Sequence, residues 1–375
     1  MGDLSNISLR EHLAELAAFK ANGSPFVSLY LNAHADQHGR DNFAPFVRKE
    51  FNKRVKDFEE DSQEHKSFIQ DSGRIARYLE KDLPASANGV AIFACAGADG
   101  YFKAIELDAP IQSNELHISD RPHLYPLARV ADQYPRYAAL IADTDAARLF
   151  VFDLGKIDGR SELDNTGNDL AQDGVRSPLR YERRVEEYNS LHAKEAVEML
   201  RRVVRDESIR HIILAGDDVI VPLLRKHLPT ELADMVVDVL PLDIRMPEHE
   251  ILKATLGSMQ MDNIQSDAEK VRDLLDKYRS GGAAVVGLRD TLTALSRGQV
   301  DELLLSASPN EISVDEGILY DAVSGSKMGP IEPGSAAAGM LVTEAVQTGA
   351  AITFVEDPAI LAGIGGVGAV LRYQA

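Results

Sequence analysis

Residues 137–153 read Tyr-Ala-Ala-Leu-Ile-Ala-Asp-Thr-Asp-Ala-Ala-Arg-Leu-Phe-Val-Phe-Asp, two apolar runs on either side of a short polar turn. We expect residues 137–142 and 148–153 to be the strands of a hairpin, because Asp and Thr suit such a turn. Farther along, the continuous apolar run of residues 212–215 predicts a buried strand. A long helical pattern lies between them. This alternation of strands and helices predicts an α/β fold, a mixed sheet with covering helices.

A similar succession of patterns extends over most of the 375-residue chain. Since a domain typically has about 150 residues, this length predicts two or three domains. We expect an N-terminal α/β domain over residues 1–130, a central domain over 136–262 and a C-terminal αβα domain over 263–375, each with a mixed sheet. A polar loop over residues 155–176 is expected to be mobile, and the last domain is expected to begin with a helix over 268–278.

The formal net charge of −19 opposes nonspecific binding to nucleic acid, because affinity for phosphates depends on accumulated Lys and Arg. Any contact with RNA must therefore come from a local basic patch, and DNA is not an expected partner. The single cysteine, Cys95, lies in an apolar run, which predicts a buried thiol in a reducing compartment. The sequence shows neither a signal peptide nor an apolar run of ~20 residues, so a cytoplasmic protein without a membrane partner is expected.

Motifs for cofactors and metals are absent or misleading. Residues 363–368 (Gly-Ile-Gly-Gly-Val-Gly) satisfy the dinucleotide pattern G-x-G-x-x-G, but only seven residues follow, too few for the helix and strand that the motif requires. We expect these glycines to let a terminal strand approach its neighbours closely. The ten histidines match no zinc pattern, and no nucleophile-elbow, Walker or kinase string occurs. Neither a cofactor nor a metal is expected.

Residues 174–184, Gly-Val-Arg-Ser-Pro-Leu-Arg-Tyr-Glu-Arg-Arg, place several arginines at the start of the long central helix. The Ser-Pro pair at residues 177–178 marks this start, because Ser is a preferred cap and Pro is tolerated at the first helical position. The arginines lie four residues apart on one helix face, or beside that face. They are Arg176, Arg180, Arg183 and Arg184.

Arginines at this end of a helix are unfavourable, because the helix dipole favours anions there and each cation costs about 0.3 kcal/mol or more. An anionic partner, such as an RNA phosphate, would reverse the sign of this effect. Guanidinium groups also suit phosphate recognition through their planar fork of donors. The alternative is a solvated basic face paired with Glu182, Glu186 and Glu187 of the same helix. The residue pattern alone leaves both interpretations open.

This region, and the order of elements along the chain, resembles the archaeal and eukaryotic class-1 peptide-chain release factor superfamily, and more closely its bacterial, Pelota-like branch. In those proteins a hairpin opens the central domain, a loop bearing Gly-Gly-Gln follows, and a helix begins Ser-x-x-Arg, then Phe or Tyr, then x-Arg. Residues 177–183 match that helix start. Residues 27–31, 214–216, 300–305 and 365–373 are similar to further family strings. The resemblance implies an RNase-H-like middle domain and a ribosomal-protein-like C-terminal domain.

The chain departs from the family at its catalytic motif. Counting back from Ser177 places Gly174, Val175 and Arg176 where Gly-Gly-Gln would stand. In the family that glutamine positions a water or the ester at the peptidyl-transferase centre, and arginine cannot simply substitute for it; Gln172 is a nearby candidate. The family's stop-codon reader, Asn-Ile-Lys-Ser, is also absent from the first domain. Stop-codon-dependent peptide release is therefore not expected.

The resemblance implies a noncatalytic, ribosome-associated factor that enters the A site like a tRNA, as rescue and hibernation factors do. It also implies a translational GTPase, such as elongation factor Tu, as partner of the C-terminal domain. Contacts with rRNA or tRNA are expected from Gly174, Arg176, Arg180, Arg183, Arg184, His192 and Lys194. Two alternatives stay open: a peptidyl-tRNA hydrolase that uses Gln172 in a degenerate loop, and a protein-interaction scaffold without ribosome contact, which the net charge of −19 favours.

Overall fold

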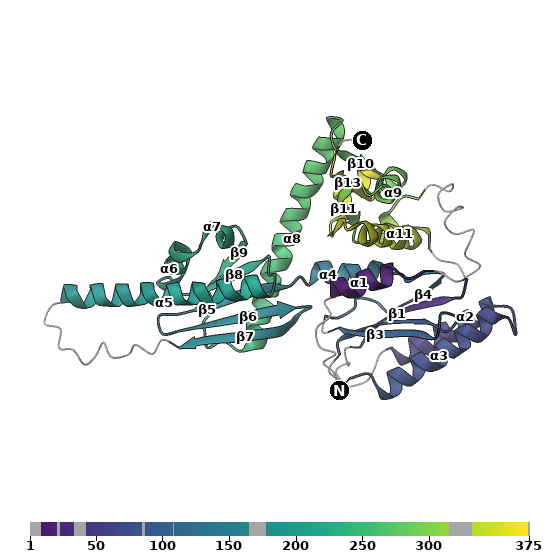
Figure 1. The fold of residues 1–375 in the computed structure, drawn as a ribbon, viewed down its shortest axis with the longest axis horizontal. Helices are drawn as coiled ribbons and strands as arrows, with labels where there is room; N and C mark the ends of the chain where they lie inside the picture. Colours follow the sequence, from purple (N-terminus) through teal and green to yellow (C-terminus); the bar gives the residue numbers. More distant parts are fainter. Residues whose placement is uncertain are drawn as a thin grey trace. The chain divides into compact units, whose positions relative to one another are not determined.

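The computed structural model describes residues 9–20, 23–33, 43–84, 87–107, 109–164, 178–314 and 332–373. The chain groups into two compact units, unit 1 with residues 1–133 and 264–375 and unit 2 with residues 134–263. The described residues form three sheets with covering helices (Figure 1), so the α/β class predicted from the sequence is confirmed. The division into three domains stays a prediction, and its first and last members both belong to unit 1.

The first sheet of unit 1 is antiparallel, with strand order β3-β2-β1-β4. Its strands are β1 (Phe26–Asn32), β2 (Gly89–Cys95), β3 (Tyr101–Leu107) and β4 (Glu115–Ser119). Helices α2 (Ala44–Arg54) and α3 (Gln63–Lys81) cover one face, where Phe68 and Ile75 pack against Val27 and Leu29. A mixed sheet was predicted here. The difference arises because two consecutive helices return the chain to the end of the sheet where β1 stops.

The second sheet of unit 1 is mixed, with strand order β10-β13-β11-β12. Its strands are β10 (Ala284–Val286), β11 (Val300–Ser306), β12 (Ala351–Val355) and β13 (Val367–Leu371). The helices of this part of unit 1 are α1 (Leu9–Ala17), α4 (Tyr125–Gln133), α9 (Leu288–Ser296) and α11 (Pro333–Thr348). A Cβ atom at Gly368 in β13 would lie 3.1 Å from the Val285 carbonyl oxygen. The close approach predicted for the terminal glycines is confirmed at this position.

Unit 2 is built on a mixed sheet with strand order β7-β6-β5-β8-β9. Its strands are β5 (Tyr137–Ala142), β6 (Ala146–Asp153), β7 (Lys156–Asp164), β8 (Ile212–Gly216) and β9 (Val236–Leu240). The predicted hairpin is β5 and β6, and β5, β8 and β9 run parallel. β7 lies where a mobile loop was predicted to begin. That prediction was wrong for residues 156–164, because pairing with β6 overrides their largely polar composition.

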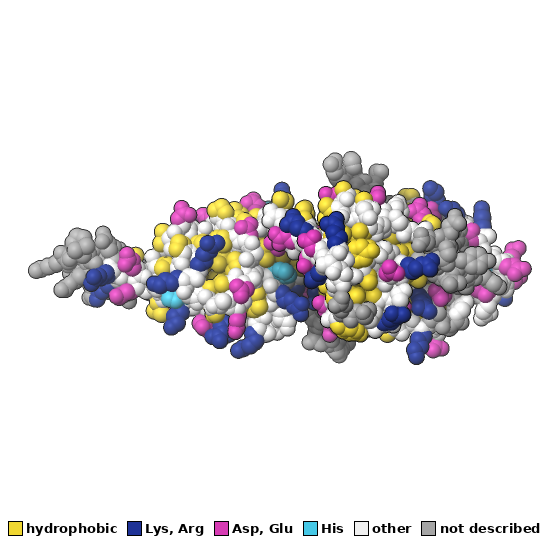
Figure 2. All heavy atoms as spheres, turned by 90° about the horizontal axis from the view of Figure 1, so that it is seen from above, with side chains coloured by type: hydrophobic (Ala, Val, Ile, Leu, Met, Phe, Trp, Pro, Cys, Tyr) yellow, Lys and Arg dark blue, Asp and Glu magenta, His cyan; other side chains and the backbone are white. Residues whose placement is uncertain are grey.

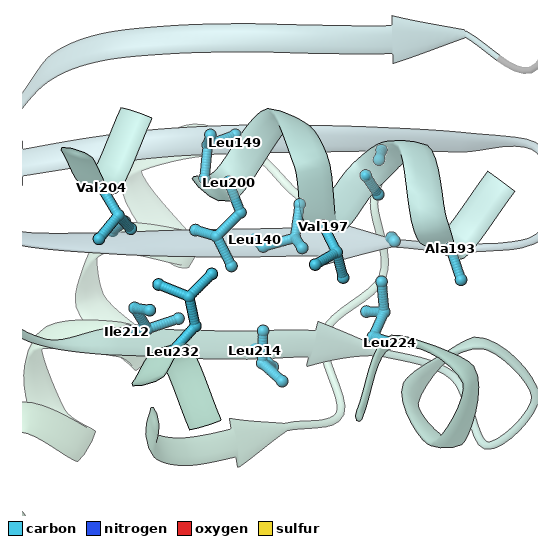
Figure 3. Packing of buried hydrophobic residues seen from close by; sticks show 14 of the residues in the cluster. Leu140, Leu149, Ala193, Val197, Leu200, Val204, Ile212, Leu214, Leu224 and Leu232 are labelled. Atoms are coloured by element: carbon cyan, nitrogen blue, oxygen red, sulfur yellow. The ribbon is translucent and has the colours of Figure 1, made fainter. Parts of the chain in front are cut away.

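Helices cover both faces of this sheet. α5 (Pro178–Asp206), α6 (Ile220–His227) and α7 (Thr230–Ala233) lie on one face, where Leu140, Leu200 and Leu224 pack together (Figure 3). The other face packs against α8 (Glu248–Arg279) through Ile251 and Met259. Successive residues of β5 alternate between the two cores, as the two-residue period of a strand requires.

Helix α8 is longer than the sequence predicted. It runs for 32 residues without interruption, whereas a helix was expected only over residues 268–278. Its buried side chains include Thr255 and Asp267 as well as apolar residues. These polar members obscure the apolar period on which the prediction depended. None of the described helices is long and apolar enough to cross a membrane.

Candidate nucleic-acid interface

Helix α5 buries one side over only part of its 29 residues. Its buried stripe runs at spacings of three and four residues through Asn189, Ala193, Ala196, Leu200 and Val204. None of the side chains of residues 183–188 is buried. In Figure 1 the first turns of α5 extend beyond the strands of unit 2. This segment of the helix is therefore held out from the sheet, with Arg183, Arg184, Glu186 and Glu187 exposed.

The structure places the sequence-predicted residues in three different settings. Arg183, Arg184 and Lys194 are exposed on α5. Arg180 belongs to the first turn of α5, although its side chain is not described. The remaining positions outside the described residues are Gln172, Gly174 and Arg176.

His192 lies in the interior rather than on the surface. Its exposed fraction is 1%, and neither ring nitrogen has a hydrogen-bond partner within the part of the chain that the structure describes. The neighbouring Ala193 and Ala196 belong to the same buried stripe. In this arrangement the ring cannot reach an RNA backbone, so the structure gives no support to His192 as a direct RNA contact.

The charges at the start of α5 follow the unfavourable order for a helix. Its first turn holds no acidic residue, and Arg183 and Arg184 follow in the second turn. Glu187 is four residues after Arg183, within reach along the helix, yet no described carboxylate forms a salt bridge with Arg183. The pairing alternative is therefore not seen at Arg183. Arg184 does interact with another group.

Helix α6 adds basic residues that the sequence reasoning missed. Its last turn consists of Arg225, Lys226 and His227. The Ser190 hydroxyl of α5 lies 2.8 Å from the His227 Nε2 atom, so this turn sits beside α5 between Arg183 and Lys194. The signal in the sequence is three consecutive basic residues after an apolar run. Only the packing of the two helices shows that these residues belong next to α5.

The carboxyl edge of the parallel strands in unit 2 has the opposite charge. A cavity of about 380 Å³ lies there, lined by Asp143, Asp217, Asp218, Asp243 and Arg245 among others. The Arg245 backbone N–H and guanidinium group lower the pKa of the Asp243 carboxyl. Asp143 and Asp217 accept hydrogen bonds from nearby backbone N–H groups, as turn-forming Asp residues do. No set of three or more potential ligands for a metal ion occurs among the described residues.

The middle of the chain matches a known family. Residues 122–260 fit the sequence model of the bacterial archaeo-eukaryotic release factor family 10. This segment includes the whole sheet of unit 2, α5 and α6. This part of the chain is therefore similar to the bacterial release-factor-like proteins. The resemblance to the bacterial branch of the release factor superfamily, predicted from the sequence, is confirmed.

Several solved structures are similar over most of their length. The archaeal translation termination factor aRF1 is 18% identical, with 98% of this chain and 99% of that chain covered and a TM-score of 0.27. Dom34 of S. cerevisiae, a translation termination-like factor, is 12% identical over 76% of this chain and 80% of its own, with a TM-score of 0.41. Archaeal Pelota, from a model of its ribosome-bound form, is 12% identical over 98% and 94%, with a TM-score of 0.43. No curated protein sequence matches the chain.

Proposed function

We propose that this protein is a ribosome-associated translation factor of the rescue or hibernation type, which enters the A site as a tRNA does and decodes no stop codon. The release-factor-like middle region supports the proposal. The observation that carries it is the position of Arg183, exposed near the positive end of a helix that projects past its sheet and without a described carboxylate partner.

A phosphate backbone fits this site on physical grounds. The N-terminal end of a helix attracts anions, and its unpaired N–H groups point towards them. Arginine adds a charge-assisted, two-pronged hydrogen bond to phosphate oxygens. The net charge of −19 works against long-range attraction, so binding depends on this local group of cations. We expect the RNA contacts to come from Arg176, Arg180, Arg183, Arg184 and Lys194.

The partners follow from the same proposal. rRNA of the A site, or a tRNA held nearby, would supply the phosphates, and the protein would act in the cytoplasm. A translational GTPase such as elongation factor Tu would deliver the factor and bind the part of unit 1 formed by residues 264–375. Gln172 lies outside the described residues, and no described feature favours peptidyl-tRNA hydrolysis.

Sedimentation with purified bacterial ribosomes in low salt tests the proposal. The wild-type protein should sediment with ribosomes, and Arg183→Gln/Arg184→Gln should bind about tenfold more weakly, because two phosphate contacts are lost. The matched control is Arg245→Gln/Lys253→Gln, which makes the same change in charge on exposed residues away from the start of α5. A wild-type protein that stays in the supernatant would refute ribosome association and favour the scaffold alternative.

A further inference from the structure

The last turn of α6 lies beside α5, and both helices carry exposed basic residues near their contact. On α5, Arg183, Ser190 and Lys194 are spaced by seven and four residues, which places them on the same side of the helix. The hydrogen-bond distance of 2.8 Å between Ser190 and His227 brings the end of α6 to this side. Arg225 and Lys226 immediately precede His227 and are exposed. We call Arg183, Lys194, Arg225 and Lys226 the α5–α6 basic face.

The dimensions of this face suit a nucleic-acid backbone. Arg183 and Lys194 are eleven residues apart, which corresponds to about 16 Å along a helix. This length would let the face contact several successive phosphates of one strand along α5, with α6 alongside. Figure 2 shows Lys and Arg side chains spread over unit 2, with Asp and Glu side chains between them.

The charges of the face are only partly compensated. Within the described residues, no carboxylate forms a salt bridge with Arg183, Lys194, Arg225 or Lys226. Helix α6 holds no acidic residue between Ile220 and His227. The exposed Glu187 lies four residues after Arg183, on the same side of α5 as Arg183 and Lys194. Helix C-termini favour cations, which stabilises Arg225 and Lys226 in place by about 0.3 to 1 kcal/mol each at low ionic strength. That local effect accounts for basic residues at the end of α6 but not for the packing of this end against α5.

We propose that the last turn of α6 extends the RNA contacts of α5, so that the α5–α6 basic face holds the phosphate backbone of a folded RNA beside the start of α5. This inference rests on the proposed ribosome association and extends it to residues outside the loop and helix start. The start of α5 would contact one stretch of RNA, and α6 would contact the adjoining backbone. Because phosphate contacts do not read base identity, the face would position the protein rather than select a sequence.

The salt dependence of binding to purified ribosomes provides the test. Arg225→Gln/Lys226→Gln should weaken binding about fivefold to tenfold and flatten the slope of log affinity against log salt by about 1.5, since each phosphate contact contributes about 0.7 to 0.9. Arg245→Gln/Lys253→Gln, with the same change in charge, should leave both quantities unchanged. Glu187→Gln should strengthen binding to ribosomes, because it removes a negative charge from the side of α5 that carries Arg183 and Lys194.

The outcomes separate this inference from the function on which it rests. If the wild-type protein binds, Arg183→Gln/Arg184→Gln weakens binding and Arg225→Gln/Lys226→Gln does not, α6 is no RNA contact and the inference is overturned while ribosome association stands. If the wild-type protein does not bind ribosomes, both fail. Circular dichroism and thermal unfolding of each variant establish that α6 remains folded, so that a loss of affinity reports a loss of contact.

Discussion

The two long helices of this chain arrange their charges in opposite ways. Helix α8 begins with Glu248 and Glu250 and ends with Lys277 and Arg279. This is the order that the helix dipole favours, with anions at the start and cations at the end. The sequence of α8 is therefore consistent with a purely structural role at both of its ends.

Helix α5 departs from this order at its start. It has no acidic residue in its first turn, and Arg180, Arg183 and Arg184 occupy its first two turns. Its last turn, with Arg205, follows the usual order. The departure is confined to the segment that projects past the sheet. This comparison supports the proposal that the start of α5 binds an anionic partner, at a small cost to the stability of the helix.

The largest expected change in the free energy of unfolding comes from two carboxyl groups, that of Asp267 in the second half of α8 and that of Asp132 in α4. Burial raises the pKa of Asp132 to about 7 and that of Asp267, on α8, to about 6. An unfolded Asp has a pKa of about 3.9. Between about pH 4 and pH 7 the folded protein therefore holds protons that the unfolded chain releases. The free energy of unfolding should fall as the pH rises through this window and level off above it.

Asp132→Asn/Asp267→Asn should remove most of this pH dependence and raise the free energy of unfolding at about pH 8 by on the order of 2 kcal/mol. Urea unfolding at about pH 5 and about pH 8 measures the difference. Asp276→Asn, on the exposed side of α8, is the control. An unchanged pH dependence in the double variant would show that these two groups do not cause it.

The next effect is expected at the start of α8. Glu248→Arg/Glu250→Arg should lower the free energy of unfolding by about 1 to 2 kcal/mol, because it opposes the helix dipole. It also removes the salt bridges of Glu248 with Arg148 and Arg160. Thermal unfolding at low salt measures the loss, and the mid-helix variant Glu269→Arg should show little of it. If the variant is as stable as the wild type, the order of charges along α8 does not contribute measurably to the free energy of unfolding.

The buried side of α5 gives a smaller effect. His192→Leu should lower the free energy of unfolding by no more than about 1 kcal/mol, and could raise it. The reason is that it replaces two buried ring nitrogens, which have no hydrogen-bond partner among the described residues, with apolar atoms. Affinity for ribosomes should not change. A variant that stays folded and loses ribosome binding would show that His192 reaches RNA after all, by a rearrangement of α5.

The smallest stability effect is expected at the start of α5, together with a large functional one. Arg180→Glu/Arg183→Glu should raise the free energy of unfolding by about 0.5 to 1 kcal/mol, because it restores the charge order that α8 already has. Sedimentation with ribosomes should be lost at the same time. Loss of stability instead would show that the arginines support the fold, and would remove the main argument for an anionic partner.

The sequence predicted the elements whose signals are local. The hairpin of β5 and β6 and the buried strand β8 were found from apolar runs bounded by turn residues. β4 and α4 were not separated from the proline-containing stretch between residues 110 and 126. β4 has a polar pattern at the edge of its sheet, and its pairing with β1 across more than 80 positions is not visible in the sequence. β4 therefore forms because of its pairing with a strand that is distant in the sequence, and a local sequence pattern cannot show this.

The candidate site could be predicted only in part. The arginines at the start of α5 follow from helix spacing and from the Ser-Pro start signal. His192 was named from the family resemblance, but it precedes Ala196 by four residues and lies on the buried stripe of α5. The contribution of Arg225 and Lys226 requires the packing of α6 on α5, which the Ser190–His227 contact reveals. No pattern within α6 indicates which helix it will adjoin.

The central claim is that a local basic face binds RNA phosphates in a protein of net charge −19. Its most direct test is the affinity of the wild-type protein for purified ribosomes from about 50 to about 200 mM salt. If the seven proposed cations (Arg176, Arg180, Arg183, Arg184, Lys194, Arg225 and Lys226) each engage one phosphate, affinity should fall with a logarithmic slope of about −5 to −6. A slope near zero, or no binding even at the lowest salt, would contradict the claim.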